Sequence, residues 1–235
     1  MRIPLAALLT TLLLATATRA EDKAPLVVEL FTSQGCSSCP PADRYVAELA
    51  EREGVLALSF HVDYWDYIGW KDPFSSPENT RRQRAYANRF HLRYVYTPQV
   101  VIDGVSQFTG SDRDAIETAL ASHAKHRPQL PLALERDTGG LVATLPQVWE
   151  CAACDLWLVA FDREHMTPIK RGENAGKTLT NRNVVRELRH LGTWHGEARS
   201  IPVPTPQQGE VAAVLLQTQA TGQIVAAATL PLGGD

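Results

Sequence analysis

Residues 27–43, Val-Val-Glu-Leu-Phe-Thr-Ser-Gln-Gly-Cys-Ser-Ser-Cys-Pro-Pro-Ala-Asp, decide the fold of this chain. The apolar run at 26–32 predicts a buried β-strand, and the proline pair at 40–41 predicts the start of a helix. Cys36 and Cys39 stand between them, close enough to share a disulfide. The partial positive charge of a helix N-terminus stabilises a thiolate, the reactive form of cysteine. Strand, CxxC and helix in this order therefore predict a redox site.

The first half of the chain alternates between strand and helix patterns. The predicted strands cover residues 26–32, 55–62, 95–102 and 105–109, and the predicted helices cover residues 42–52, 76–90 and 112–125. Strands that alternate with helices predict a partly parallel sheet flanked by helices. We therefore expect an α/β domain over residues 26–126.

The second half, residues 127–235, contains only strand patterns. Short runs of strand-forming residues alternate with turn signals, at 130–135, 141–145, 155–161, 166–170, 184–191, 197–203, 211–217 and 224–230. Asp162-Arg163 is interpreted as one of these turns. Regularly spaced short strands predict a small β-sandwich as a C-terminal domain.

Residues 1–20 have the pattern of a secretory signal peptide. Arg2 supplies the positive end, residues 3–17 supply an apolar stretch, and small residues precede cleavage after Ala17 or Ala20. The apolar stretch is short for a spanning helix, which needs about 20 residues. We expect a periplasmic or secreted mature protein without stable membrane insertion, in a compartment where disulfides persist.

The charge balance restricts the class of partner. The net charge is −3, from 23 Lys and Arg residues against 26 Asp and Glu residues, and no basic patch stands out. This pattern argues against a nucleic-acid partner. The arginines at 81, 82, 84 and 89 are interpreted as a solvated helix face.

Thr97-Pro98, just before the predicted hairpin, adds a second motif to the cysteine pair. Together they resemble the thioredoxin fold, and this resemblance implies that residues 26–126 form a thioredoxin-like domain. The segments VVELFTSQGCSSCPPAD, SFHVDYWDYIGWKDPF, RQRAY and VYTPQVVIDG resemble, more closely, one secreted bacterial group. That group is the domain-of-unknown-function family 1223, whose function is unassigned.

The resemblance implies roles for four residues. Cys36 would be the exposed attacking cysteine, Cys39 the resolving cysteine, and Pro98 a cis-proline facing them, with Thr97 beside it. The sequence departs from thioredoxin in the Ser-Ser dipeptide of the motif and in Gly35, where thioredoxin has tryptophan.

The position of a thioredoxin-type buried acid, six residues before Cys36, is Leu30. Glu29 is one residue away, on the opposite strand face unless a bulge intervenes. A proton-shuttling role for Glu29 is therefore a hypothesis that needs such a bulge.

The predicted chemistry is thiol–disulfide exchange without a cofactor. The Cys36 thiolate attacks a substrate disulfide, and Cys39 then attacks Cys36 and releases the substrate. Ser37 and Ser38 could donate hydrogen bonds to the thiolate. The expected partners are exported protein thiols or disulfides and a redox partner.

Two alternatives for Cys36 and Cys39 stay open. One alternative is a structural disulfide. Another is a copper or zinc site made by Cys36, Cys39 and His61.

Two further motifs have open interpretations. In the aromatic segment 63–74, Trp65, Tyr67 and Trp70 are candidate substrate-binding residues, with core packing as the alternative. The second CxxC, Cys151 and Cys154, precedes a strand, so a structural disulfide is the first interpretation. A relay pair that exchanges electrons with the first pair and a joint four-cysteine zinc site are the alternatives.

Overall fold

The computed structural model describes residues 24–149 and 151–233, so the predicted signal peptide lies outside the described residues. Helices and strands alternate in the first half, and strands alone follow. The helices are α1 (Pro40–Ala50), α2 (Pro77–Arg89), α3 (Arg113–His126) and a short 3₁₀ helix η1 (Asp63–Trp65). The strands are β1 (Leu26–Thr32), β2 (Val55–His61), β3 (Gln99–Ile102), β4 (Ser106–Thr109), β5 (Ala133–Asp137), β6 (Gly140–Leu145), β7 (Cys154–Pro168), β8 (Thr178–Trp194), β9 (Arg199–Val203), β10 (Val211–Thr218) and β11 (Ile224–Pro231).

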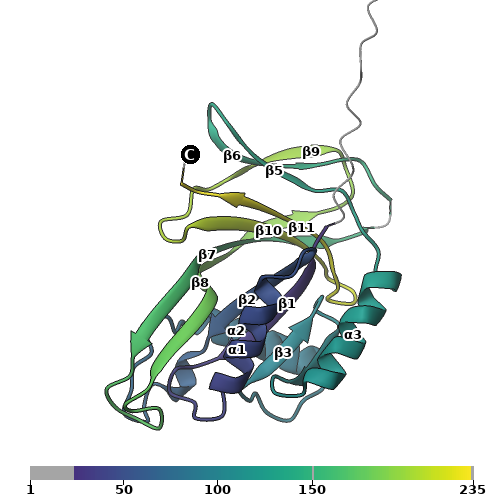
Figure 1. The fold of residues 1–235 in the computed structure, drawn as a ribbon. Helices are drawn as coiled ribbons and strands as arrows, with labels where there is room; N and C mark the ends of the chain where they lie inside the picture. The colour runs from purple at the N-terminus through teal and green to yellow at the C-terminus, as the bar shows by residue number, and fades with distance from the viewer. Residues whose placement is uncertain (1–23, 150, 234–235) are drawn as a thin grey trace, which may run out of the picture.

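A large mixed sheet runs through both halves of the chain in the order β11-β10-β7-β8-β2-β1-β3-β4. β1 pairs with β2 in parallel and with β3 antiparallel. The two halves meet where β2 and β8 join through one residue pair, Ser59 and Val184. Figure 1 shows the three helices beside the lower part of this sheet and the long hairpin β7–β8 continuing it.

Both faces of β1 are buried, which explains its unbroken apolar run. Leu30 faces a core with Ala42 of α1 and Ile116 of α3. Phe31 faces the opposite core, which contains Tyr86 of α2. Helices therefore cover both faces of the sheet around β1, and the site at its carboxyl end lies between packed layers.

A small second sheet, in the order β5-β6-β9, covers one face of the β-rich half. Leu134, Leu141 and Val203 of this sheet pack against Leu156 of β7 and Val214 of β10. The structure thus confirms a mixed α/β fold with a β-rich second half. The domain boundary between residues 126 and 127 stays a prediction, because strands from both sides of it share the large sheet.

The predicted turn at Asp162-Arg163 is wrong. β7 continues through both residues and pairs with β8 as far as Pro168 and Thr178. Asp162 accepts hydrogen bonds from His165 and Arg186, so its charge is satisfied within the strands. The turn comes later, at residues 171–176, where Gly172 and Gly176 have positive φ. The hairpin is consequently much longer than predicted.

The other end of β1 is fixed by Arg127, which donates a hydrogen bond of 2.8 Å to the carbonyl oxygen of Pro25. Pro25 immediately precedes β1, whose last residue is Thr32. Residues 33–39, which connect β1 to α1, are called the cysteine loop.

In the part of the chain that the structure describes, none of the helices has the length and apolar character needed to span a membrane.

Candidate redox site at the start of helix α1

Cys36 and Cys39 form a disulfide with a Cα–Cα distance of 5.4 Å. A turn precedes it, in which the Cys36 amide donates to the carbonyl oxygen of Ser33 over 3.1 Å. Cys39 is the N-cap residue of α1. Both sulfurs therefore lie at the positive end of the helix, as the sequence predicted.

The two prolines of α1 limit this electrostatic support. Pro40 and Pro41 have no N–H, and the next amides, those of Ala42 and Asp43, donate to the Cys39 carbonyl over 2.9 and 3.0 Å. The Ser38 hydroxyl oxygen lies 3.4 Å from Cys36 Sγ. A Cys36 thiolate would thus receive a hydrogen bond from Ser38 in addition to the helix field.

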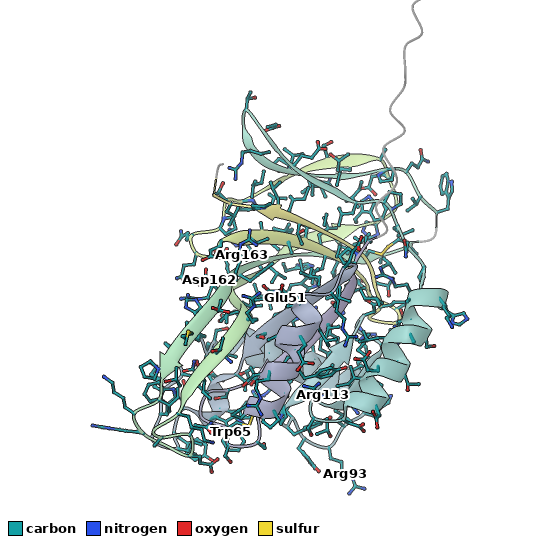
Figure 2. The ribbon with its side chains drawn as sticks, in the orientation of Figure 1. Glu51, Trp65, Arg93, Arg113, Asp162 and Arg163 are labelled. Atoms are coloured by element: carbon teal, nitrogen blue, oxygen red, sulfur yellow. A yellow bond between two sulfur atoms is a disulfide. The ribbon has the colours of Figure 1, made fainter. Side chains whose placement is uncertain are left out.

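The peptide bond between Thr97 and Pro98 is cis. A Cβ placed on Gly110 would meet the Cβ atoms of both Ala42 and Pro98 within 3.0 Å, so the proline packs beside the first turn of α1. The Trp65 indole donates to Thr97 Oγ1 over 2.8 Å, and its Cβ lies 3.4 Å from a Cβ built on Gly35. Trp65, labelled in Figure 2, thus links Thr97 to the cysteine loop.

The expectation that Cys36 is exposed is wrong. The residue is 1% exposed and Cys39 is 0% exposed, whereas Ser37 and Ser38 between them face solvent. A loop from the second half of the chain contacts the motif directly. We call residues 171–176, between β7 and β8, the cap loop.

The cap loop is bound to the backbone of the cysteine loop. Asn174, fully buried, donates from Nδ2 to the carbonyl oxygens of Gln34 and Cys36, over 2.9 Å each. The Ser37 amide donates to Glu173 over 3.2 Å, and hydrogen bonds from Ser37 lower the pKa of this glutamate. Sequence reasoning missed this contact, because polar residues between glycines are typical of any turn and do not indicate a partner.

The aromatic candidates take two different positions. Trp65 and Trp70 are half-buried, and the Trp70 indole donates to Gln34 Oε1 over 3.2 Å. Trp70 also lies against Gly172 of the cap loop. Tyr67 between them is 83% exposed. The two tryptophans therefore form part of the site, and Tyr67 offers its ring to solvent on the same segment.

A cluster of buried polar side chains lies on the face of the sheet that α1 covers. Thr32 donates to Asp43 Oδ1 over 2.7 Å. His61 Nδ1 lies 2.7 Å from Asp72 Oδ2, which also accepts from the Gln34 amide over 2.8 Å. Burial works against the charged form of His61, but Asp72 raises its pKa overall; His61 in turn lowers the pKa of Asp72 despite its burial. Sequence reasoning predicted no role for Asp43 or Asp72.

Glu29 does not join this cluster, so the proton-shuttle hypothesis is wrong for it. Its side chain is on the α2 face of β1, where it accepts from Arg82 over 2.5 Å and from Tyr86. No bulge interrupts the pairing of β1 with β2 from Leu26 to Thr32. Glu29 and the cysteine pair are therefore separated by the sheet.

Cys151 and Cys154 form a second buried disulfide, with a Cα–Cα distance of 6.0 Å. Cys154 begins β7, and Pro168 at the other end of β7 precedes the cap loop. At about 3.3 Å per residue, roughly 40 Å of strand separates the two disulfides. At this distance the two cysteine pairs can neither exchange electrons directly nor bind one zinc ion together, so both alternatives are wrong.

A metal site receives no support either. In the described parts of the chain, no three His, Cys, Asp or Glu side chains are placed to hold a metal ion. His61, the imidazole of the copper alternative, bonds to Asp72 through Nδ1. Its Nε2 is buried without a hydrogen-bond partner.

The chain matches one family model and is similar to several known proteins. A family model described as "Protein of unknown function (DUF1223)" matches residues 27–217. The crystal structure of protein AGR_C_4864 from Agrobacterium tumefaciens is 31% identical, with a TM-score of 0.77, and the match covers 92% of this chain and 98% of that one. HBP35 of Porphyromonas gingivalis is 14% identical, with a TM-score of 0.60 over 91% and 78% of the two chains, a likeness of fold alone.

A shorter match concerns a curated protein of Archaeoglobus fulgidus with the name "Probable Thioredoxin". It is 42% identical over 38 residues, which are 16% of this chain and 42% of that protein. The chain thus spans less than half the length of this relative.

Proposed function

This chain belongs to the DUF1223 family, and from its site we propose that it is an exported thiol–disulfide oxidoreductase acting on protein thiols or disulfides. One observation carries the proposal: the Cys36–Cys39 disulfide stands at the start of α1, and cis-Pro98 packs beside Ala42 in the first turn of that helix. The partial match to a thioredoxin adds support. In this interpretation the α/β half is a thioredoxin-like domain, and the β-rich half is a sandwich-like companion.

The reaction follows from the two sulfurs. The Cys36 thiolate attacks a substrate disulfide, one substrate sulfur leaves as a thiolate, and a Cys36–substrate disulfide forms. Cys39 then attacks Cys36, the Cys36–Cys39 bond forms, and the second substrate sulfur leaves. The substrate is reduced and the protein oxidised, and an exported redox partner returns the pair to its starting state. The opposite direction oxidises a substrate dithiol.

Burial of Cys36 adds a step to this reaction. The cap loop holds the motif through Asn174 and Glu173, so it has to move before a protein disulfide reaches Cys36. Trp65, Trp70 and exposed Tyr67 then provide an aromatic wall for the substrate, and the Thr97 backbone pairs with an extended substrate segment. The signal-peptide pattern and the two disulfides support action in the periplasm or outside the cell.

Paired cysteine variants test the proposal. Reduced wild-type protein, Cys36→Ser and Cys39→Ser are mixed with a peptide containing one disulfide, and peptide masses are followed. We expect Cys36→Ser to be inactive and Cys39→Ser to accumulate one peptide on Cys36. Replacement of Cys151 and Cys154 together by serine serves as the matched cysteine control, because a single replacement would leave a free thiol. Equal rates for wild type and Cys36→Ser would contradict the proposal.

The 1% exposure of Cys36 favours a second candidate, a disulfide that only stabilises the loop. The reduction potential separates the two. A structural disulfide has a potential below about −300 mV, whereas catalytic pairs lie between about −270 and −120 mV. Equilibration with glutathione and dithiothreitol buffers, read by alkylation of Cys36 and Cys39, measures it.

A further inference from the structure

Asp43 lies one helical turn after Cys39, on the face of α1 that the two residues share. It follows Cys39 by four residues, and its amide bonds to the Cys39 carbonyl over 3.0 Å. Residues four apart share a helix face, and helical side chains lean toward the N-terminus. The Asp43 carboxylate therefore leans back over the turn that contains Cys39.

This carboxylate is buried and held in place. Asp43 is 6% exposed, and Thr32 at the end of β1 donates to its Oδ1 over 2.7 Å. Thr32 is the register partner of His61 in the parallel pair of β1 and β2, so both side chains are on the α1 face. Asp43 thus lies in the interior between the helix and the sheet, on the same side as the disulfide.

Charged groups from the neighbouring elements face Asp43. His61 of β2 and Asp72 of the aromatic segment act on it from the sheet side, and Arg44 acts from α1 itself. Arg186 of β8 acts on His61. Burial raises the pKa of Asp43 to about 6, against the opposing effects of His61 and Thr32. A base with a pKa near the working pH exchanges protons efficiently with a reacting group.

We infer that Asp43 accepts the Cys39 proton when Cys39 resolves the mixed disulfide. The proton moves from Cys39 Sγ to the Asp43 carboxylate, directly or through one water. The Cys39 sulfur then bonds to Cys36 Sγ, and the bond from Cys36 to the substrate sulfur breaks, which releases a substrate thiolate. In the opposite direction, protonated Asp43 returns the proton to Cys39. The inference rests on the proposed thiol–disulfide exchange.

A rapid-quench experiment tests the inference. Reduced full-length protein is mixed with glutathione disulfide between pH 5 and 9 and quenched with acid. Mass spectrometry of the cysteine peptides then follows the Cys36–glutathione adduct and its conversion to Cys36–Cys39. We expect Asp43→Asn to form the adduct at the wild-type rate and to convert it at least tenfold more slowly at pH 7. The inflection near pH 6 in the conversion step should disappear.

Three further variants make the result specific. Glu48→Gln, an exposed carboxyl on the same helix, should behave as wild type. Asp43→Glu should recover part of the conversion rate. Thr32→Val should shift the inflection to higher pH, because the lost hydrogen bond had lowered the pKa of Asp43.

The two possible failures are distinguishable. Conversion by Asp43→Asn at the wild-type rate and pH profile would overturn the role of Asp43 and leave exchange at Cys36 standing. Absence of the Cys36 adduct in the wild-type protein would overturn the proposed function, and the inference with it.

Discussion

The side-chain amide of Asn174 lies 2.9 Å from the carbonyl oxygen of Cys36, although 138 residues separate the two in the sequence. The bond is to the backbone and not to the sulfur. The cap loop can therefore leave the motif without changing the chemical groups that carry out exchange. The accessibility of Cys36 to a substrate therefore depends on how often the cap loop opens.

We expect Asn174→Ala to speed reduction of the Cys36–Cys39 disulfide by dithiothreitol about tenfold or more. The variant loses the two hydrogen bonds to the Gln34 and Cys36 carbonyl oxygens, of about 1 kcal/mol each, and about 1.4 kcal/mol corresponds to a factor of ten. Time-resolved alkylation of Cys36 measures the rate. Asn183→Gly is the matched control, because Asn183 donates over 2.8 Å to the Ala57 carbonyl and has positive φ. Equal acceleration by both variants would contradict a specific role of Asn174.

Asp43→Asn should change how the free energy of unfolding depends on pH. The folded-state pKa of about 6 exceeds the ordinary 3.8, so the folded wild type binds an extra proton between these values. Its stability therefore falls as pH rises from about 4 to about 6. The variant lacks this loss and should be more stable by about 3 kcal/mol at pH 8. Urea unfolding at pH 4 and pH 8 tests this, and a constant difference at both would contradict it.

Arg82→Ala should destabilise the fold by about 3–5 kcal/mol, because the buried charge of Glu29 would lose its cationic partner. Arg82 donates to Glu29 over 2.5 Å, and both side chains are at most 5% exposed. Arg113→Ala, which breaks an exposed pair with Glu48, should cost less than about 1 kcal/mol. Chemical denaturation compares the two variants. Similar losses would mean that the buried pair contributes no more than the exposed one.

Replacing Cys151 and Cys154 together by serine should leave exchange at Cys36 unchanged. The second disulfide lies at the far end of β7, and it closes a short loop worth about 2 kcal/mol of stability in the chain-entropy model. Peptide-disulfide turnover and thermal unfolding measure the two effects. Loss of turnover with unchanged stability would contradict this prediction and would mean that Cys151 and Cys154 take part in the exchange reaction.

Local sequence patterns correctly predicted the strand and the helix on either side of the cysteine pair. β1 covers the predicted residues 26–32, because both of its faces are buried and its apolar run is continuous. Pro40 begins α1, as prolines in the first turn of a helix indicate. The place of Pro98 came from the family resemblance.

Long-range contacts were the part that the sequence could not supply. Asn174 has a polar side chain between glycines, a pattern typical of any turn, so its bonds to the cysteine loop were not predictable. The turn expected at Asp162-Arg163 failed because pairing with β8 outweighed the local preference. Asp43 gave no signal, because its burial depends on Thr32 and His61 from two neighbouring strands.

The bond from Arg127 to the Pro25 carbonyl has a practical consequence for attachment of the protein to a surface. It fixes Pro25 at the end of β1 away from Cys36, roughly 20 Å distant at about 3.3 Å per residue. A biotin or bead linked ahead of Pro25 would leave the other end of β1, and the disulfide beyond it, pointing away from the support. Immobilised protein of this kind can be used to capture mixed disulfides from an extract.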